Sequence, residues 1–170
     1  MHPSICKSAI LKLFTYGLYG PTEESRKKMG VLLLIGRILF SLIFIGSGIN
    51  HITKAKDMTG YAKMKKLPAA ALAVPLSGLM ILAGAAFIIL GVWVDLGALL
   101  IAIFCILSGV IFHNFWAADA AAKQGEMISF LKNVSIAGGA LIIVAIVNKN
   151  HGIDLGPVVS HAHQVLFTKN

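Results

Sequence analysis

Residues 30–50 read GVLLLIGRILFSLIFIGSGIN, and the only charge among them is Arg37. A helix needs roughly 20 mostly apolar residues to cross the about 30 Å hydrocarbon core of a bilayer. The stretch therefore predicts a transmembrane helix. A membrane β-strand is excluded because the run is too long and does not alternate apolar with polar residues.

Three more runs of this kind follow, at residues 69–91, 96–116 and 128–147. They agree with the composition, since 57% of the 170 residues are hydrophobic and 13% are charged, against about 45–50% and about 25% in soluble domains. This composition excludes a disordered chain, and the two Cys cannot support a disulfide scaffold. We expect an all-α polytopic membrane protein with a four-transmembrane-helix bundle over residues 30–147.

Polar segments flank and connect the four spans. Residues 1–29 are predicted to form a basic, amphipathic segment in the membrane interface, and residues 148–170 a polar, His-containing tail. Only residues 92–95 separate the second span from the third, so these two spans are predicted to form a tight hairpin. The connections at 51–67 and 117–127 are longer, and each is interpreted as either a short amphipathic helix or a loop.

The basic residues do not orient the protein by their number. With four spans, seven Lys and Arg lie on the side of the termini and seven on the other side. The count therefore gives no orientation by the positive-inside rule. Because the cluster Arg26-Lys27-Lys28 directly precedes the first span, we expect both termini in the cytoplasm.

The ends of three spans bring polar residues to one level of the bundle, opposite the side of the termini. Successive spans alternate in direction, so the end of the first span, the end of the third and the start of the fourth share this level. Polar groups are costly in hydrocarbon, and this cluster is therefore the candidate site for a ligand or a partner. Its members are Asn50, His51, His113, Asn114, Phe115, Trp116, Lys132 and Asn133.

The two histidines of the cluster have two interpretations. Interfacial imidazoles can hydrogen-bond to backbone carbonyls or lipid headgroups, or His51 and His113 can supply two nitrogen ligands to a metal ion. No carboxylate or thiolate adjoins them in the sequence, and two ligands do not make a structural metal site. We therefore predict no metal site, and the pair His161 and His163 in the irregular tail does not change this.

Arg37 lies on the same helical face as Ser41, Phe44, Gly48 and His51. At 1.5 Å per residue it is about 21 Å from His51 along the helix axis, so it does not belong to the cluster. Two interpretations remain open for this intramembrane charge. Its side chain either snorkels to the headgroups or pairs with Asp95 in the short turn.

The sequence shows no motif for catalysis. Cys6 and Cys105 are expected at different depths, which argues against a disulfide, and no C-x-x-C pair, Ser-His-Asp arrangement, phosphate loop or haem-attachment motif is found. We expect no covalently bound cofactor and no catalysis by this chain alone. Rows of small residues predict close helix packing, namely Ala69, Ala73 and Ser77, then Ala98 and Ala102, then Ser135 and Gly139.

The order of these features resembles the DoxX family of small four-helix bacterial membrane proteins, over roughly residues 30–147. The family often carries a Glu early in the second span, whereas residues 77–82 here read SGLMIL. A charge pair or proton relay built on that Glu would lack its acid in this chain. The matching pieces are Gly36-Arg37, Gly46-x-Gly48-x-x-His51, Ser77-Gly78, Gly84, Leu90-Gly91, His113-Asn114-Phe115-Trp116, Phe130-Leu131-Lys132-Asn133 and Gly138-Gly139-Ala140-Leu141.

The resemblance implies a role beside a membrane redox system. Family members are associated with thiosulfate:quinone oxidoreductases and with oxidative-stress complexes at the bacterial inner membrane. Distant relatives handle cargo in the eukaryotic secretory pathway. We therefore expect an accessory or quinone-proximal subunit of a bacterial inner-membrane oxidoreductase, whose polar cluster binds a quinone headgroup or another subunit.

The alternative is a non-catalytic interaction or assembly protein, in which the cluster caps the bundle and the loops dock another membrane protein or a second copy. Transport of a small solute is less favoured, because four helices leave little room for a pathway and no inverted repeat is apparent. Nucleic acid is not expected as a partner. The basic residues flank apolar spans, where they meet anionic lipid headgroups.

Overall fold

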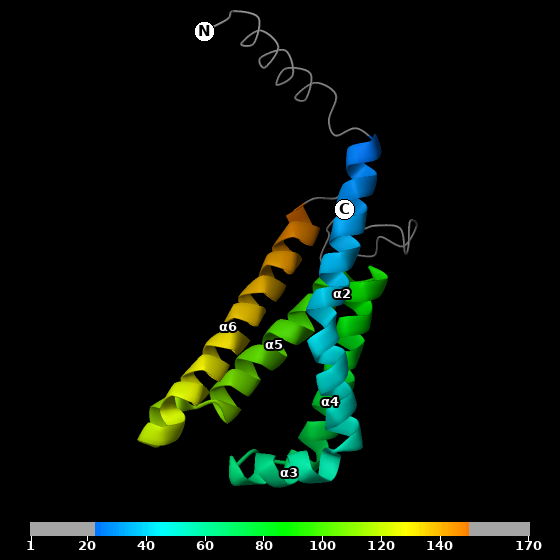
Figure 1. Ribbon diagram of the computed structural model, residues 1–170. Coiled ribbons are helices and arrows are strands. Elements are labelled where there is room, and N and C mark those ends of the chain that lie inside the picture. The colour runs from blue at the N-terminus through cyan, green and yellow to red at the C-terminus, as the bar shows by residue number, and fades with distance from the viewer. Residues whose placement is uncertain (1–22, 150–170) are drawn as a thin grey trace, which may run out of the picture.

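The computed structural model describes residues 23–149 and is helical, as predicted (Figure 1). Four of its helices are long and apolar enough to cross a membrane. The predicted N-terminal segment up to residue 22 and the tail from residue 150 lie outside the described residues. The elements are α2 (Glu23–Thr53), α3 (Ala55–Met64), α4 (Ala70–Leu90), α5 (Val94–Phe112), the 3-10 helix η1 (Phe115–Ala117) and α6 (Ala120–Lys149).

Two helices begin before the predicted spans. The first extends back to Glu23 and the fourth to Ala120, because polar residues continue the helix outside the hydrocarbon. In α2 the side chains of Glu24 and Lys28 pair at 2.8 Å, one helical turn apart. At the start of α6 the Asp119 carboxylate accepts the Ala122 backbone N–H at 2.8 Å, as an N-cap does.

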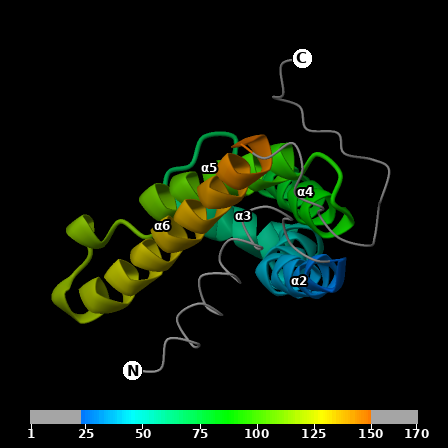
Figure 2. The same ribbon diagram turned by 90° about the horizontal axis from the view of Figure 1, so that it is seen from above.

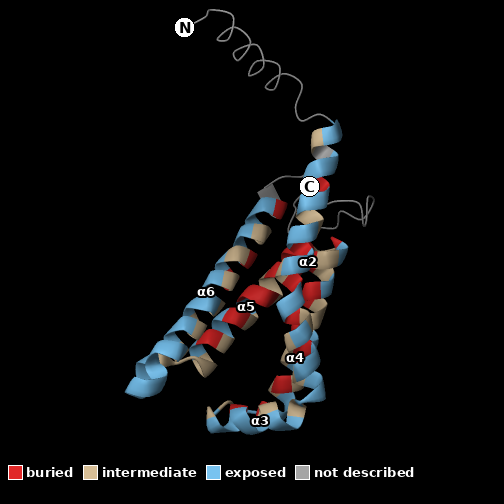
Figure 3. Ribbon diagram, in the orientation of Figure 1, coloured by how far each residue is buried: buried red, intermediate tan, exposed pale blue. Residues whose placement is uncertain are grey.

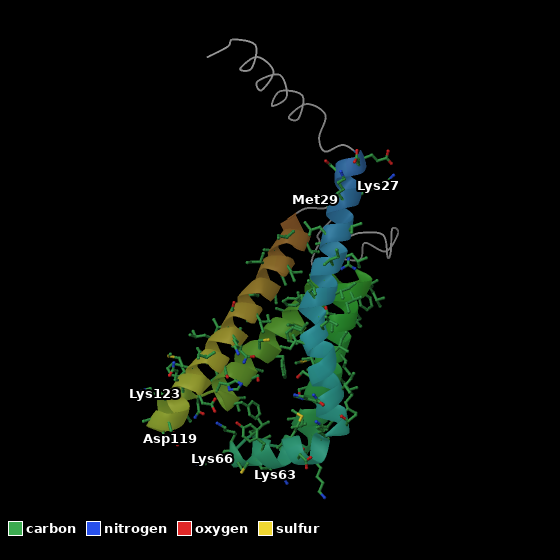
Figure 4. All side chains as sticks on the ribbon, in the orientation of Figure 1. Lys27, Met29, Lys63, Lys66, Asp119 and Lys123 are labelled. Carbon is green, nitrogen blue, oxygen red and sulfur yellow. The ribbon has the colours of Figure 1, made fainter. Side chains whose placement is uncertain are left out.

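The connection between the first and second spans contains the short helix α3, one of the two forms predicted for it. Figure 1 shows α3 lying across the end of the molecule where α2 ends and α4 begins. We call this end of the bundle the α3 end. Its surface carries charged groups, and Figure 4 shows Lys63, Lys66, Asp119 and Lys123 there, whereas Lys27 lies at the opposite end.

The long helices pack in an open row. The main contacts join α2 to α4, α4 to α5 and α5 to α6. From above, α6 and α2 lie at the two ends of the row (Figure 2), and in Figure 1 they diverge toward the α3 end. The arrangement leaves a seam between the first and last helices of the row.

Glycines allow the closest helix crossings. A Cβ added at Gly97 would lie 2.7 Å from the carbonyl oxygen of Gly84, and one added at Gly84 would lie 2.9 Å from that of Gly97. At the crossing of α2 and α4, a Cβ at Gly78 would lie 2.6 Å from the Cβ of His51 and 3.1 Å from the carbonyl oxygen of Gly48. Helix association inside a bilayer depends on such backbone approach.

The helices bury small and branched residues toward one another and expose apolar ones outward. Buried positions follow α5 along its length (Figure 3), and Ala98 and Ala102 from the predicted small-residue rows are among them. Large apolar side chains such as Leu39 and Leu72 are 64% and 67% exposed. In a bilayer, this outer surface contacts lipid chains.

Candidate functional site

His51, in the last turn of α2, is held against α4. Its Nδ1 lies 2.9 Å from the Ser77 hydroxyl oxygen and 3.2 Å from the Val74 carbonyl oxygen. The Ser77 hydroxyl donates its own hydrogen to the same Val74 carbonyl at 2.8 Å. The close crossing of Gly48 and Gly78 lies beside these contacts and brings the two helices near enough for them.

These contacts favour one tautomer of the neutral His51 ring. The Val74 carbonyl can only accept a hydrogen bond, and the Ser77 hydroxyl donates its hydrogen to that carbonyl. This arrangement favours Nδ1 as a donor, and in that tautomer the other nitrogen, Nε2, carries a lone pair. Across residues 23–149, no hydrogen bond to Nε2 of His51 is found.

His113, which follows the last residue of α5, is held from α6. Its Nδ1 lies 2.9 Å from a carboxylate oxygen of Glu126, and both side chains are about one quarter exposed (29% and 26%). The carboxylate accepts, so Nδ1 of His113 also carries a hydrogen. Glu126 was missed in the sequence, because residues 117–127 were interpreted as a connection rather than as the start of α6.

Both histidines line a first cavity, of about 330 Å³, between α3, α4 and α5. Its walls are apolar and include three aromatic rings, while its polar groups come from the two histidines, two serines and a tyrosine. Tyr61 of α3 stacks on Phe112 at 5.8 Å between ring centroids, and the edge of Phe104 meets His51 at 5.7 Å. The polar and aromatic lining residues are His51, Ser77, Ser108, His113, Tyr61, Phe104 and Phe112.

A second cavity, of about 470 Å³, lies on the other side of the histidines, between α2, α5 and α6. It shares His51, Phe104, Ser108 and His113 with the first cavity, so these four side chains stand between the two. Its lining is more polar than that of the first. Lys132 and Asn133 of α6 face this second cavity only.

The remaining members of the predicted cluster lie outside both cavities. Asn50 is exposed on α2, and Asn114 accepts a hydrogen bond from Nζ of Lys65 at 3.3 Å. Phe115 and Trp116 pack on Phe130 of α6, with ring centroids 5.4 and 5.8 Å from it. The expected single site is therefore divided between two cavities and the surface.

Asn133 lines the second cavity but uses its amide nitrogen locally, donating to the Ser129 carbonyl at 3.0 Å. Glu126 faces the surface at the α3 end. There it lines a polar hollow of about 480 Å³ together with Lys65, Lys66 and Asp119. His113 thus connects a carboxylate on this outer hollow with the two inner cavities.

Arg37 lies at the opposite end of the bundle and is 5% exposed. Its Nε donates to the Ile88 carbonyl at 2.6 Å and its Nη2 donates to the Ile89 carbonyl, both in the last turn of α4. The guanidinium therefore turns inward to cap α4, rather than toward headgroups. Asp95 is fully buried in the first turn of α5 and accepts the Leu96 N–H. The pairing of Arg37 with Asp95 stays a prediction.

Metal ligands do not gather in the described part of the chain. Between residues 23 and 149 there is no group of three or more His, Cys, Asp or Glu side chains placed to hold a metal ion. Cys105 is buried in α5, and Cys6 and the tail histidines lie outside the described residues.

Comparison with known proteins gives one family and one relative. A family model described as DoxX matches residues 32–114, a range that includes His51 and His113. Inner membrane protein YphA of Escherichia coli (strain K12) is 32% identical over 133 residues, which cover 78% of this chain and 89% of the relative. No solved structure matches the chain.

Proposed function

Because this chain belongs to the DoxX family of membrane proteins, we propose that it is an accessory subunit of a bacterial inner-membrane oxidoreductase and that its first cavity holds a quinone headgroup. The relative named as an inner membrane protein supports the location. The partner subunits of such a complex would carry the redox centres. This chain would place the headgroup beside them.

The size and lining of the first cavity support a ring-shaped ligand. Its volume of about 330 Å³ is at the lower end of the roughly 300–1,000 Å³ typical of small-molecule sites. Phe104, Phe112 and Tyr61 offer aromatic surfaces for a flat ring. The polar groups are few and stand among these rings, as in sites that orient a mostly apolar ligand.

One observation supports the choice of ligand, namely two histidines that line one apolar cavity and whose Nδ1 atoms contact protein oxygens. Nδ1 donates to a protein oxygen in both His51 and His113, so each neutral ring offers a lone pair at Nε2. A quinone has only carbonyl acceptors, whereas the reduced quinol has two hydroxyl donors. We infer that the cavity prefers the quinol.

The same geometry gives one of the two protons of a quinol a way out. Oxidation of a quinol releases two electrons and two protons, and the electrons would pass to the partner's redox centre. His113 can take one hydroxyl proton at Nε2 while its Nδ1 proton moves to Glu126, which opens on the polar hollow. His51 can take the other proton and hold it, since its Nδ1 contacts only Ser77 and the Val74 carbonyl.

Binding of a short-chain ubiquinol to the protein in nanodiscs tests this proposal. We expect His51→Leu and His113→Leu each to weaken binding about tenfold, the loss of one hydrogen bond of about 1.4 kcal/mol. Trp116→Leu is the control, because Trp116 is exposed outside both cavities. Equal affinity for the oxidised and reduced forms would refute the preference for quinol, and absence of binding to the unaltered protein would refute the site.

The accessory role needs a separate test on native membranes. When this protein is purified in mild detergent, we expect subunits of a membrane oxidoreductase to copurify with it. Deletion of the protein is expected to lower quinone-linked respiration. Purification without any redox partner, together with unchanged respiration, would overturn the role.

A second candidate function is that of a non-catalytic interaction or assembly protein. Trp116 and Met64 favour it, because they are 55% and 74% exposed at the α3 end, where a partner or a second copy could cover them. In this case His113→Ala and Lys132→Ala would weaken complex formation while leaving electron transfer per assembled complex unchanged.

We also propose that both termini face the cytoplasm. The cluster Arg26-Lys27-Lys28 supports this orientation, since it directly precedes the apolar part of α2. The α3 end, with its histidines and cavities, would then lie at the periplasmic side.

A further inference from the structure

The second cavity, which the proposed function does not use, presents an unneutralised charge at membrane depth. Lys132 lies about 18 Å along α6 from Ala120, at 1.5 Å per residue. Among the residues from 23 to 149, no ion pair or hydrogen bond is found for Lys132, and none for the hydroxyls of Ser47 and Ser135, which line the same cavity. Lys132 and Ser135 are exposed and Ser47 is half-buried, so these groups are accessible to an anionic or polar ligand, which a cation at this depth favours.

A separate apolar hollow lies further along the seam between α2 and α6. This hollow, of about 390 Å³, is lined mostly by apolar residues of these two helices, including Gly36, Leu33 and Ile143, with Arg37 of α2 and Val94 of α5 at its edge. Phe44 lines the polar cavity and Phe40 the apolar hollow, and their ring centroids are 5.5 Å apart. The two rings are therefore neighbours, and the two spaces follow one another along α2.

The length of the seam fits one lipid chain. From Lys132 to Ile143 the rise along α6 is about 17 Å. This is close to half of the about 30 Å hydrocarbon core, which is the share that the chains of one leaflet fill. A polar compartment at one end and an apolar one at the other match a headgroup and its acyl chain.

We propose that the seam between α2 and α6 is a binding site for an anionic phospholipid, with the phosphate at Lys132 and an acyl chain along Phe44 and Phe40 toward Gly36. Ser47 and Ser135 donate hydrogen bonds to the phosphate oxygens. A free phosphate ion shares the headgroup chemistry, but it would leave the apolar hollow without an occupant. The phosphate position lies outside the first cavity, which Lys132 does not line, although the two cavities share His51 and His113.

Native mass spectrometry of detergent-purified protein with added phosphatidylglycerol or phosphatidylcholine tests the site. We expect the unaltered protein to prefer phosphatidylglycerol about fivefold, the effect of one lysine beside an anionic headgroup. Lys132→Gln should abolish this preference. Lys123→Gln is the matched control, because it removes the same charge from the same helix and Lys123, exposed like Lys132, lies outside the seam.

A further variant separates a lipid from a free anion. No atom outside its own helix lies within 4 Å of a Cβ built at Gly36, so Gly36→Leu fills the apolar hollow without a clash of its Cβ. This variant should weaken the binding of long-chain phosphatidylglycerol about tenfold and leave the binding of a dihexanoyl form unaffected. Equal binding of both lipid classes to the unaltered protein, equal loss in Lys123→Gln and Lys132→Gln, or full competition by millimolar inorganic phosphate would each overturn the proposal.

Discussion

At the scale of single residues, Arg37 shows how the bundle tolerates a charge within a span. The carbonyls in the last turn of a helix have no partner within that helix, and in a bilayer water does not replace it. Arg37 reaches across from α2 and satisfies two of them, at Ile88 and Ile89. Its positive charge also lies at the negative end of the α4 dipole.

Replacement of this residue is therefore expected to destabilise the bundle. Arg37→Met should lower the free energy of unfolding by roughly 2–3 kcal/mol, since charged hydrogen bonds are lost and carbonyls are left without partners. Denaturation in bicelles measures this change in the free energy of unfolding. Lys28→Met is the control, because the Lys28–Glu24 pair is exposed and such pairs contribute little. An Arg37→Met protein as stable as the control would contradict the capping role.

At the scale of helices, two pairs of glycines decide which surfaces meet. At the α4–α5 crossing the backbones approach so closely that a Cβ on Gly97 would lie 2.7 Å from a carbonyl oxygen of α4. Gly138 in α6, by contrast, has no atom of another element within 4 Å of such a Cβ. Identical substitutions should therefore act in opposite directions.

Gly97→Ala is expected to lower the stability of the protein by about 1–3 kcal/mol, because the helices must separate. Gly138→Ala should be neutral or raise stability by up to about 1 kcal/mol, since alanine favours the helix and nothing obstructs it. Thermal unfolding in detergent compares the two variants. Similar effects of both would show that the α4–α5 contact is looser than described.

The apolar runs and the helix crossings differ in how far they could be predicted. Spans follow from composition and length, and all four were predicted. The small-residue rows included Ala98 and Ala102 but not the Gly84 and Gly97 crossing, because which glycine meets another helix depends on the rotation of both. The lengths of α2 and α6 beyond the predicted spans did not follow from hydropathy, since polar residues such as Asp119 begin or continue a helix outside the membrane.

For the site, the sequence predicted the level in the bundle but not the grouping. His51, His113 and Lys132 do line cavities at the α3 end. Side-chain partners could not be predicted, because Ser77 and Glu126 come from other helices whose facing positions depend on tertiary packing. Trp116 and Asn50 fell outside the cavities for the same reason.

At the scale of the whole molecule, an even number of spans puts the start of α2 and the end of α6 on one side of the membrane and the α3 end on the other. Single cysteines at Lys27, Lys63 and Lys123, in a chain with Cys6→Ser and Cys105→Ala, would report their side. With an impermeant maleimide on intact spheroplasts, we expect labelling at positions 63 and 123, and at position 27 only after permeabilisation. The reverse pattern would invert the orientation, and labelling of all three from one side would refute four spans.

The cap on α4 also fixes an order of events during synthesis. The carbonyl that receives Nε of Arg37 is 51 residues further along the chain, which a ribosome adds in about 3–10 s. During this interval the nascent first span carries a guanidinium without the acceptors that it has in the finished protein. We therefore expect the first span to stay beside the insertion machinery, or in contact with water, until α4 emerges, so that the two segments enter the lipid as a pair.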